Sequence, residues 1–180
     1  MTTFVSFIIR PAKWDSSRTL VHPAGYPIEA PPIFSITTSK ERKPNVVAFS
    51  GWGAGPFDII GDGNFPKSFH STCHLTLRGQ PLEMRLSQSG SGECKFEHPT
   101  MGQMKWKPDM FSSSKMELRD GSGRRVATFG KGKSGEKTLE IIQGDPYFME
   151  LVLISGITAI NLNKGMTEVV GELLGGVLGA

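Results

Sequence analysis

The sequence predicts a single, mainly antiparallel β domain built as a barrel or a sandwich. Short runs that alternate apolar and polar residues recur along the chain, as expected for strands with one buried face. Turn signals separate these runs at intervals of about 8–12 residues, and no long helical period appears before residue 145. The 180 residues fit one domain that is long enough to bury a core.

The predicted strands follow one another from the N-terminus. They cover residues 4–9, 33–39, 45–52, 69–79, 81–88, the two arms of a hairpin over 114–130, and 137–144. Alternation is clearest in 69–79, where Cys73, Leu75 and Leu77 share one face. Gly79-Gln80 is expected to turn the chain into 81–88, and residues 120–123 are expected to form the tip of the later hairpin. The Pro- and Ser-rich stretch 11–32 is expected to be extended and only partly regular.

An apolar run over residues 148–162 carries Glu150 as its only charge. It is too short for a membrane span, which needs about 20 apolar residues. Asp145 as a cap and Pro146 in the first turn favour a helix, with Glu150 expected in that first turn. Ile154 and the other β-branched residues favour a strand. Periodicity leaves a fully enclosed helix and a central strand open, because the run is apolar on every side.

The last segment, 164–180, is predicted to be an amphipathic tail helix. Apolar residues recur at helical spacing from Met166 to Leu178, and the opposite face is acidic and rich in glycine. The favoured interpretation is that this helix covers an open edge of its own domain. The alternative is contact with a partner protein through residues 166–180.

The order of these parts resembles a known superfamily. The residues that carry the likeness are Trp106, the hairpin tip Asp120, Gly121 and Gly123, then Val126, Ala127 and Phe129, and the run Leu151 to Leu162. Over residues 33–163 the chain is similar to the Tubby C-terminal-like superfamily, which includes the LURP-one-related proteins and the phospholipid scramblases. It looks most like the short fungal members of unknown function.

The resemblance implies a closed antiparallel β-barrel of about twelve strands, with one hydrophobic helix threaded through its axis. Residues 1–163 would form this domain, with the enclosed helix near 147–163. The run would then be apolar on all sides because the barrel surrounds it. Tubby proteins bind phosphoinositides through basic residues on the barrel surface. That basic site cannot be matched here residue by residue.

The charge pattern indicates a candidate binding surface for anions. A net charge of +3 is too mild to indicate a nucleic-acid partner, but it permits a local basic patch. The most basic stretch of the chain supplies the first five candidates and the flanks of Trp106 supply two more: Arg124, Arg125, Lys131, Lys133, Lys137, Lys105 and Lys107. Such residues could bind anionic membrane lipid such as a phosphoinositide, and each charge would contribute about 1 kcal/mol of binding free energy. The competing interpretation is ordinary solvated surface charge.

Other chemistry finds little support in the sequence. The stretch 127–134 fits a relaxed P-loop pattern, but a strand follows it where a P-loop needs a helix, so it is interpreted as a hairpin turn. His70 and His74 on one strand would lie ~13 Å apart, too far for one metal.

Cys73 and Cys94 could pair across adjacent strands or remain inert thiols in a reducing compartment. Trp14, Trp52 and Trp106 could stack on a ligand, although burial is the commoner fate of tryptophan.

These observations together predict a non-enzymatic binding module without metal or cofactor. It is expected to be intracellular and cytoplasmic, with no transmembrane span and with peripheral contact to anionic membrane lipid. The alternative function is a protein-interaction or structural module that uses the tail helix.

Overall fold

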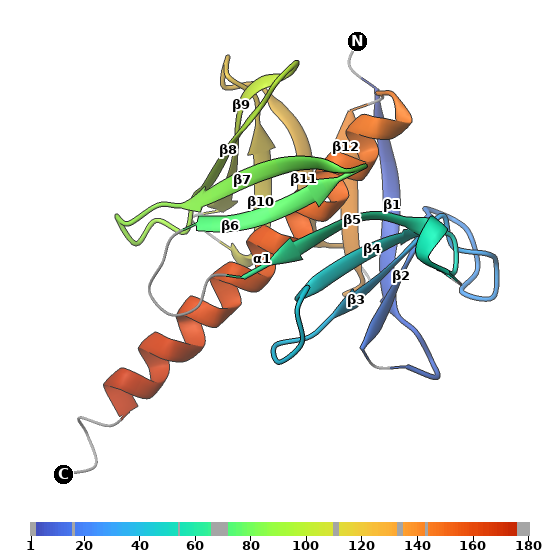
Figure 1. Cartoon of the computed structure of the whole chain (residues 1–180), viewed down its shortest axis with the longest axis horizontal. Coiled ribbons are helices and arrows are strands. Elements are labelled where there is room, and N and C mark those ends of the chain that lie inside the picture. The colour runs from blue at the N-terminus through green and yellow to red at the C-terminus, as the bar shows by residue number, and fades with distance from the viewer. Residues whose placement is uncertain are drawn as a thin grey trace.

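The structure, a computed structural model, describes residues 3–15, 17–53, 55–65, 72–109, 112–132, 135–142 and 144–175. For residues 112–114 and 164–175 the description covers the backbone only. The chain forms a closed antiparallel barrel of twelve strands, and one helix runs through it (Figure 1). The fold class expected from the sequence is therefore confirmed.

The barrel is a simple meander, in which each strand pairs with its neighbour in the sequence. Its first and last strands also pair, with Phe7 opposite Leu139, and this closes the ring. An even number of strands allows this closure to be antiparallel, and closure leaves no unpaired strand edge. The strands are β1 (Phe4–Pro11), β2 (Arg18–Pro23), β3 (Phe34–Thr38), β4 (Val46–Ser50), β5 (Ile59–Asn64), β6 (Thr72–Leu77), β7 (Gln80–Leu86), β8 (Cys94–His98), β9 (Gly102–Asp109), β10 (Ser112–Arg119), β11 (Arg125–Lys131) and β12 (Lys137–Ile142).

Four of these strands, β2, β5, β8 and β9, were not predicted from the sequence. The stretch 11–32, expected to be only partly regular, contributes β2. In β8 the alternation is present, since Cys94 and Phe96 are buried while Lys95 is exposed. In β5 it is obscured by glycines at inward positions. An added Cβ at Gly63 would lie 2.8 Å from Leu75 Cδ2 and 3.2 Å from Thr158 Oγ1 on the helix. A side chain at this position would therefore clash with both β6 and the helix.

The apolar run forms the helix α1 (Pro146–Gly175). Asp145 caps it, because its Oδ1 accepts a hydrogen bond from the Phe148 amide at 2.7 Å. Every residue from Glu150 to Ala159 is buried, so burial inside the barrel outweighs the strand preference of the β-branched residues. Glu150, expected in the first turn, lies instead in the second, since no acidic residue occupies the first turn.

The helix packs tightly against the barrel wall at Gly156. A Cβ added there would lie 2.9 Å from Cζ2 of Trp106 and 3.2 Å from Cδ2 of Phe129. Trp106 is fully buried, and its Nε1 donates a hydrogen bond to Ser155 Oγ at 3.0 Å. The tryptophan is thus a core residue that holds the helix in register with β9.

The two helical segments predicted for 147–163 and 164–180 join into one continuous helix as far as Gly175. Figure 1 shows its last turns extending beyond the strands. The predicted apolar and acidic faces of the tail lie outside the side chains that the structure describes. Within the described part of the chain, no helix combines the length and apolar content that a membrane crossing needs.

An ion pair fastens the β6–β7 turn to the start of the helix. The turn residues are Arg78 and Gly79, both with positive φ (49° and 77°), so the expected turn at Gly79-Gln80 is shifted by one residue. Arg78 donates to both carboxylate oxygens of Glu150, with Nε 2.9 Å from Oε2. The Glu150 side chain is 7% exposed and that of Arg78 is 50% exposed. A buried charge on the helix is thereby neutralised from the rim of the barrel.

Candidate anion-binding surface

Five cationic residues face one another across five neighbouring strands. The pairing places Arg85 of β7 opposite Lys95 of β8, and Lys95 opposite Lys105 of β9. Lys105 is in turn opposite Arg119 of β10, which is opposite Arg125 of β11. We call these five residues the basic belt.

Strand alternation explains why the belt lies on the outside of the barrel. The neighbours of its members, such as Met84, Phe96, Trp106 and Leu118, are buried in the core, so the members themselves point outward. A shift of register between Leu118 and Arg119 brings Arg125 into the row, as a β-bulge does. At about 4.8 Å between strands, the belt extends over roughly 19 Å.

Acidic neighbours neutralise the belt only in part. Glu83 lies 3.5 Å from Arg85, and Glu93 lies 3.9 Å from Lys95. Glu117 lies 2.7 Å from Arg119 and 3.7 Å from Arg125. Five cations against three carboxylates leave a local excess of positive charge.

The centre of the belt is the least neutralised part. Among the residues that the structure describes, no carboxylate lies within ion-pair distance of Lys105. The residues directly opposite it, Lys95 and Arg119, carry the same charge. Like charges in directly opposed positions destabilise a sheet. The row is therefore not explained by the stability of the barrel.

One end of the belt opens into a shallow depression of about 360 Å³, lined by Phe4, Arg119, Arg124 and Arg125. We call it the arginine depression. Arg119 donates to the Gly123 carbonyl at 2.9 Å, and the Arg125 guanidinium lies 5.5 Å from the centre of the Phe4 ring. Guanidinium groups held in this way keep further N–H donors free for an anion, since each has five.

The third arginine of the depression is held by the hairpin tip. Asp120 Oδ2 accepts a hydrogen bond from Arg124 Nε at 3.1 Å. The Ser122 hydroxyl, with further hydrogen bonds from Arg124, holds the pKa of Asp120 below its usual value. The carboxylate is therefore ionised at neutral pH and fixes the conformation of the tip.

Some of the predicted site residues are gathered here. Lys105 and Arg125 belong to the belt, and Arg124 lines the arginine depression. Lys107 lies next to the belt on β9, in the position opposite Glu117. These four of the predicted residues share one region of the outer surface.

The other predicted residues do not join them. Lys131 faces Lys137 across β11 and β12, and Lys131 is six residues, or roughly 20 Å, along β11 from Arg125. Lys133 lies outside the described residues. The basic loop predicted from the sequence is thus two separate regions at opposite ends of β11.

Sequence reasoning missed Arg85, Lys95 and Arg119. Each is the outward residue of an alternating run, so a local signal exists, but each run holds only one or two cations. Only the register between neighbouring strands, which the pattern within one strand does not give, places them in one row.

The remaining candidates show no reactive arrangement. Cys73 and Cys94 are free and buried, and burial raises the pKa of both thiols to about 12, so they stay protonated at neutral pH. Trp14 and Trp52 lie on the outer surface with ring centres 5.4 Å apart. Among the described residues, no group of three or more His, Cys, Asp or Glu side chains could hold a metal ion; His70 is outside them.

Comparisons with known proteins add no further evidence on the site. No protein-family model, curated protein or solved structure matches the chain. The Tubby-like resemblance stays a prediction, and the candidate site rests on the geometry of the chain's own residues.

Proposed function

We propose that the protein is a non-enzymatic binding module that takes phosphorylated headgroups of anionic membrane lipid on its basic belt. The observation that carries the proposal is the belt itself, a row of like charges directly opposed on five neighbouring strands. The order of predicted elements in the sequence resembles that of Tubby proteins, which bind phosphoinositides, and this resemblance favours the same class of ligand. We therefore also propose that the chain is a Tubby-like domain acting at the membrane periphery.

Phosphate is the anion that this surface suits best. Arginine binds phosphate through two parallel N–H donors, and lysine binds it as a point charge. Side chains that are directly opposed lie about 5 Å apart. Two phosphate groups on one headgroup can therefore contact neighbouring members of the belt, with Lys105 between Lys95 and Arg119. Binding would relieve the repulsion that these cations exert on one another.

Liposome co-sedimentation over a series of salt concentrations tests the proposal. The protein is expected to sediment with vesicles that contain a phosphoinositide, and less so as salt rises. The double variant Lys95→Gln/Lys105→Gln removes two belt cations whose contacts are weak or absent. At about 1 kcal/mol per charge, it is expected to bind roughly 30-fold more weakly at low salt.

A matched control removes two cations outside the belt. In Lys13→Gln/Lys131→Gln the net charge falls by the same amount, so binding within about twofold of wild type is expected. Equal losses in both variants would reduce the effect to overall charge and contradict the belt. Competition by the soluble inositol phosphate headgroup separates headgroup recognition from general attraction to a charged bilayer.

An absence of binding at low salt would remove the lipid proposal and leave the protein-interaction alternative. Deletion of residues 166–180 tests that alternative. Loss of self-association with a soluble, folded remainder would support it, whereas an insoluble remainder would show that the tail belongs to the core.

A further inference from the structure

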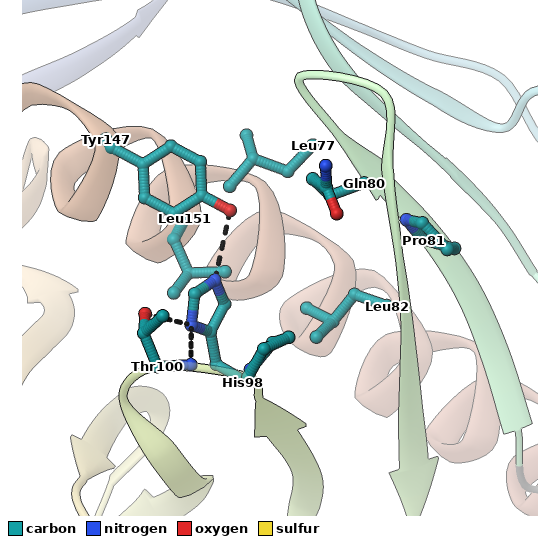
Figure 2. Close-up of a pocket in the computed structure, with 9 residues that line it drawn as sticks. Leu77, Gln80, Pro81, Leu82, His98, Thr100, Tyr147 and Leu151 are labelled. Carbon is teal, nitrogen blue, oxygen red and sulfur yellow. Dashed lines mark hydrogen bonds between the residues drawn. The ribbon is translucent and has the colours of Figure 1, made fainter.

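A pocket of about 290 Å³ lies at the end of the barrel where α1 begins. Its walls come from the β6–β7 hairpin, the β8–β9 turn and the first two turns of the helix (Figure 2). Leu77, Leu82 and Leu151 give it an apolar lining. Its size is close to the lower limit for pockets that bind small molecules, about 300 Å³.

The protonation of His98 in this pocket follows from its neighbours. The backbone amides of Thr100 and Met101 point at Nδ1 from 3.3 and 3.4 Å. An amide can only donate, so Nδ1 must be the unprotonated acceptor. The ring is 7% exposed, and burial lowers the pKa of His98, which favours the neutral form. The single ring proton is therefore on Nε2.

This assignment determines what Tyr147 can do. His98 Nε2 lies 3.0 Å from the Tyr147 hydroxyl, and with its proton it must be the donor of that hydrogen bond. The tyrosine oxygen is the acceptor, so its own proton remains available. Figure 2 shows the hydroxyl directed to the side of the pocket where Leu77 and Gln80 lie. No protein acceptor for this proton is found among the described residues.

The surroundings favour a neutral ligand. An ion would lose its hydration against the three leucines without gaining a counter-charge. Arg78, the cation on the same hairpin, is already paired with Glu150. An uncharged carbonyl group can accept one hydrogen bond without this loss.

We propose that this pocket binds a small neutral molecule with an apolar body and one carbonyl acceptor, which takes the hydrogen bond from Tyr147. The proposal is independent of the belt, because it uses none of the belt residues and needs no anionic surface. His98 is a positioning residue: it occupies the acceptor site of the tyrosine oxygen and directs the hydroxyl proton into the pocket.

Titration with methyl pentyl ketone, followed by the amide NMR signals of Thr100 and Met101, tests the proposal. Saturable shifts of both signals are expected for the wild-type protein. Tyr147→Phe keeps the ring but removes the donor, so it is expected to weaken ketone binding about fivefold. The alkene in which a methylene group replaces the carbonyl oxygen should bind equally well to both proteins.

Two further variants control the result. Tyr26→Phe changes the only other tyrosine, which is exposed outside the pocket, and should leave ketone binding unchanged. Gln80→Trp places a large ring at the exposed rim and should weaken both ligands. The proposal is overturned if the wild type shows no saturable shift up to the solubility of the ketone. Equal ketone affinity in Tyr147→Phe or in Gln80→Trp would overturn it as well.

Discussion

The interior of the barrel and the basic belt differ in how their polar and charged groups are paired. Inside, the polar groups around the helix are paired with partners: the Trp106 indole donates to Ser155, and Glu150 is neutralised by Arg78. On the belt, Lys105 faces two residues of its own charge. The first arrangement contributes to stability, whereas the second reduces it.

This difference indicates which residues stability can explain. A natural sequence is expected to be consistent across packing, pairing and charge except where function requires otherwise. The helix and its contacts meet that expectation, so their residue types follow from the fold. The belt departs from it over five adjacent strands, and this departure is the support for the proposed anionic ligand.

Removing one partner of the ion pair at the barrel rim should have the largest effect. Arg78→Met leaves the carboxylate of Glu150 buried without a counter-charge, which should cost about 3 kcal/mol of unfolding free energy. Glu150→Gln leaves a half-exposed arginine that water can solvate, so it should cost about 1 kcal/mol. Urea unfolding of the two variants measures this asymmetry.

The double variant Arg78→Met/Glu150→Met provides the control for this pair. It removes both charges, so much of the stability lost in Arg78→Met should return. Equal losses in the two single variants would show that Glu150 is not effectively buried.

Gly156→Ala should have the next largest effect. In a solvated helix this change would stabilise by about 1 kcal/mol. Here the new methyl group would press on the Trp106 and Phe129 rings, and overpacking of this kind costs about 1–3 kcal/mol. A net loss of about 1 kcal/mol is expected from urea unfolding. In a Trp106→Phe background the loss should shrink or change sign, because Cζ2 and Cη2 of the indole are absent.

Much of the fold could be predicted from local patterns. Alternation within 69–79 located β6 (Thr72–Leu77), although residues 69–71 lie outside the described part of the chain. Asp145-Pro146 located the start of the helix. Local patterns could not decide between a helix and a central strand for 148–162, because an enclosed segment has no polar face from which to read a period. The likeness to a barrel family supplied that answer, and the structure confirms the enclosed helix.

There are also physical reasons why some strands were not predicted from the sequence. In β5, Gly61 and Gly63 hide the apolar alternation, because close approach to neighbouring strands and to the helix excludes side chains there. The alternation of β8 was present but brief, at five residues. Strand pairing, and not residue propensity, makes these segments regular.

The candidate site was less predictable than the fold. Clusters along the sequence identified Arg124 and Arg125, but they also grouped Lys131 with them, although it lies at the other end of β11. Arg85 and Lys95 enter the belt only through the register in which neighbouring strands pair. The positions of charged residues along the sequence do not reveal how neighbouring strands pair, so the row could not be predicted from them.

The smallest expected change in unfolding free energy comes from Lys105→Gln, which tests directly whether the belt destabilises the barrel. Lys105→Gln removes the central like charge, so it should raise the unfolding free energy by about 0.5 kcal/mol at low salt. The gain should fade as salt rises, because screening at about 0.1 M already acts over about 10 Å. Lys13→Gln is the control, since Lys13 faces Glu29 at 3.3 Å and its loss should lower stability or leave it unchanged. Unfolding curves at several salt concentrations measure both variants. A loss of stability in Lys105→Gln would mean that the belt is structurally favourable, and the physical argument that it exists for an anionic ligand would fail.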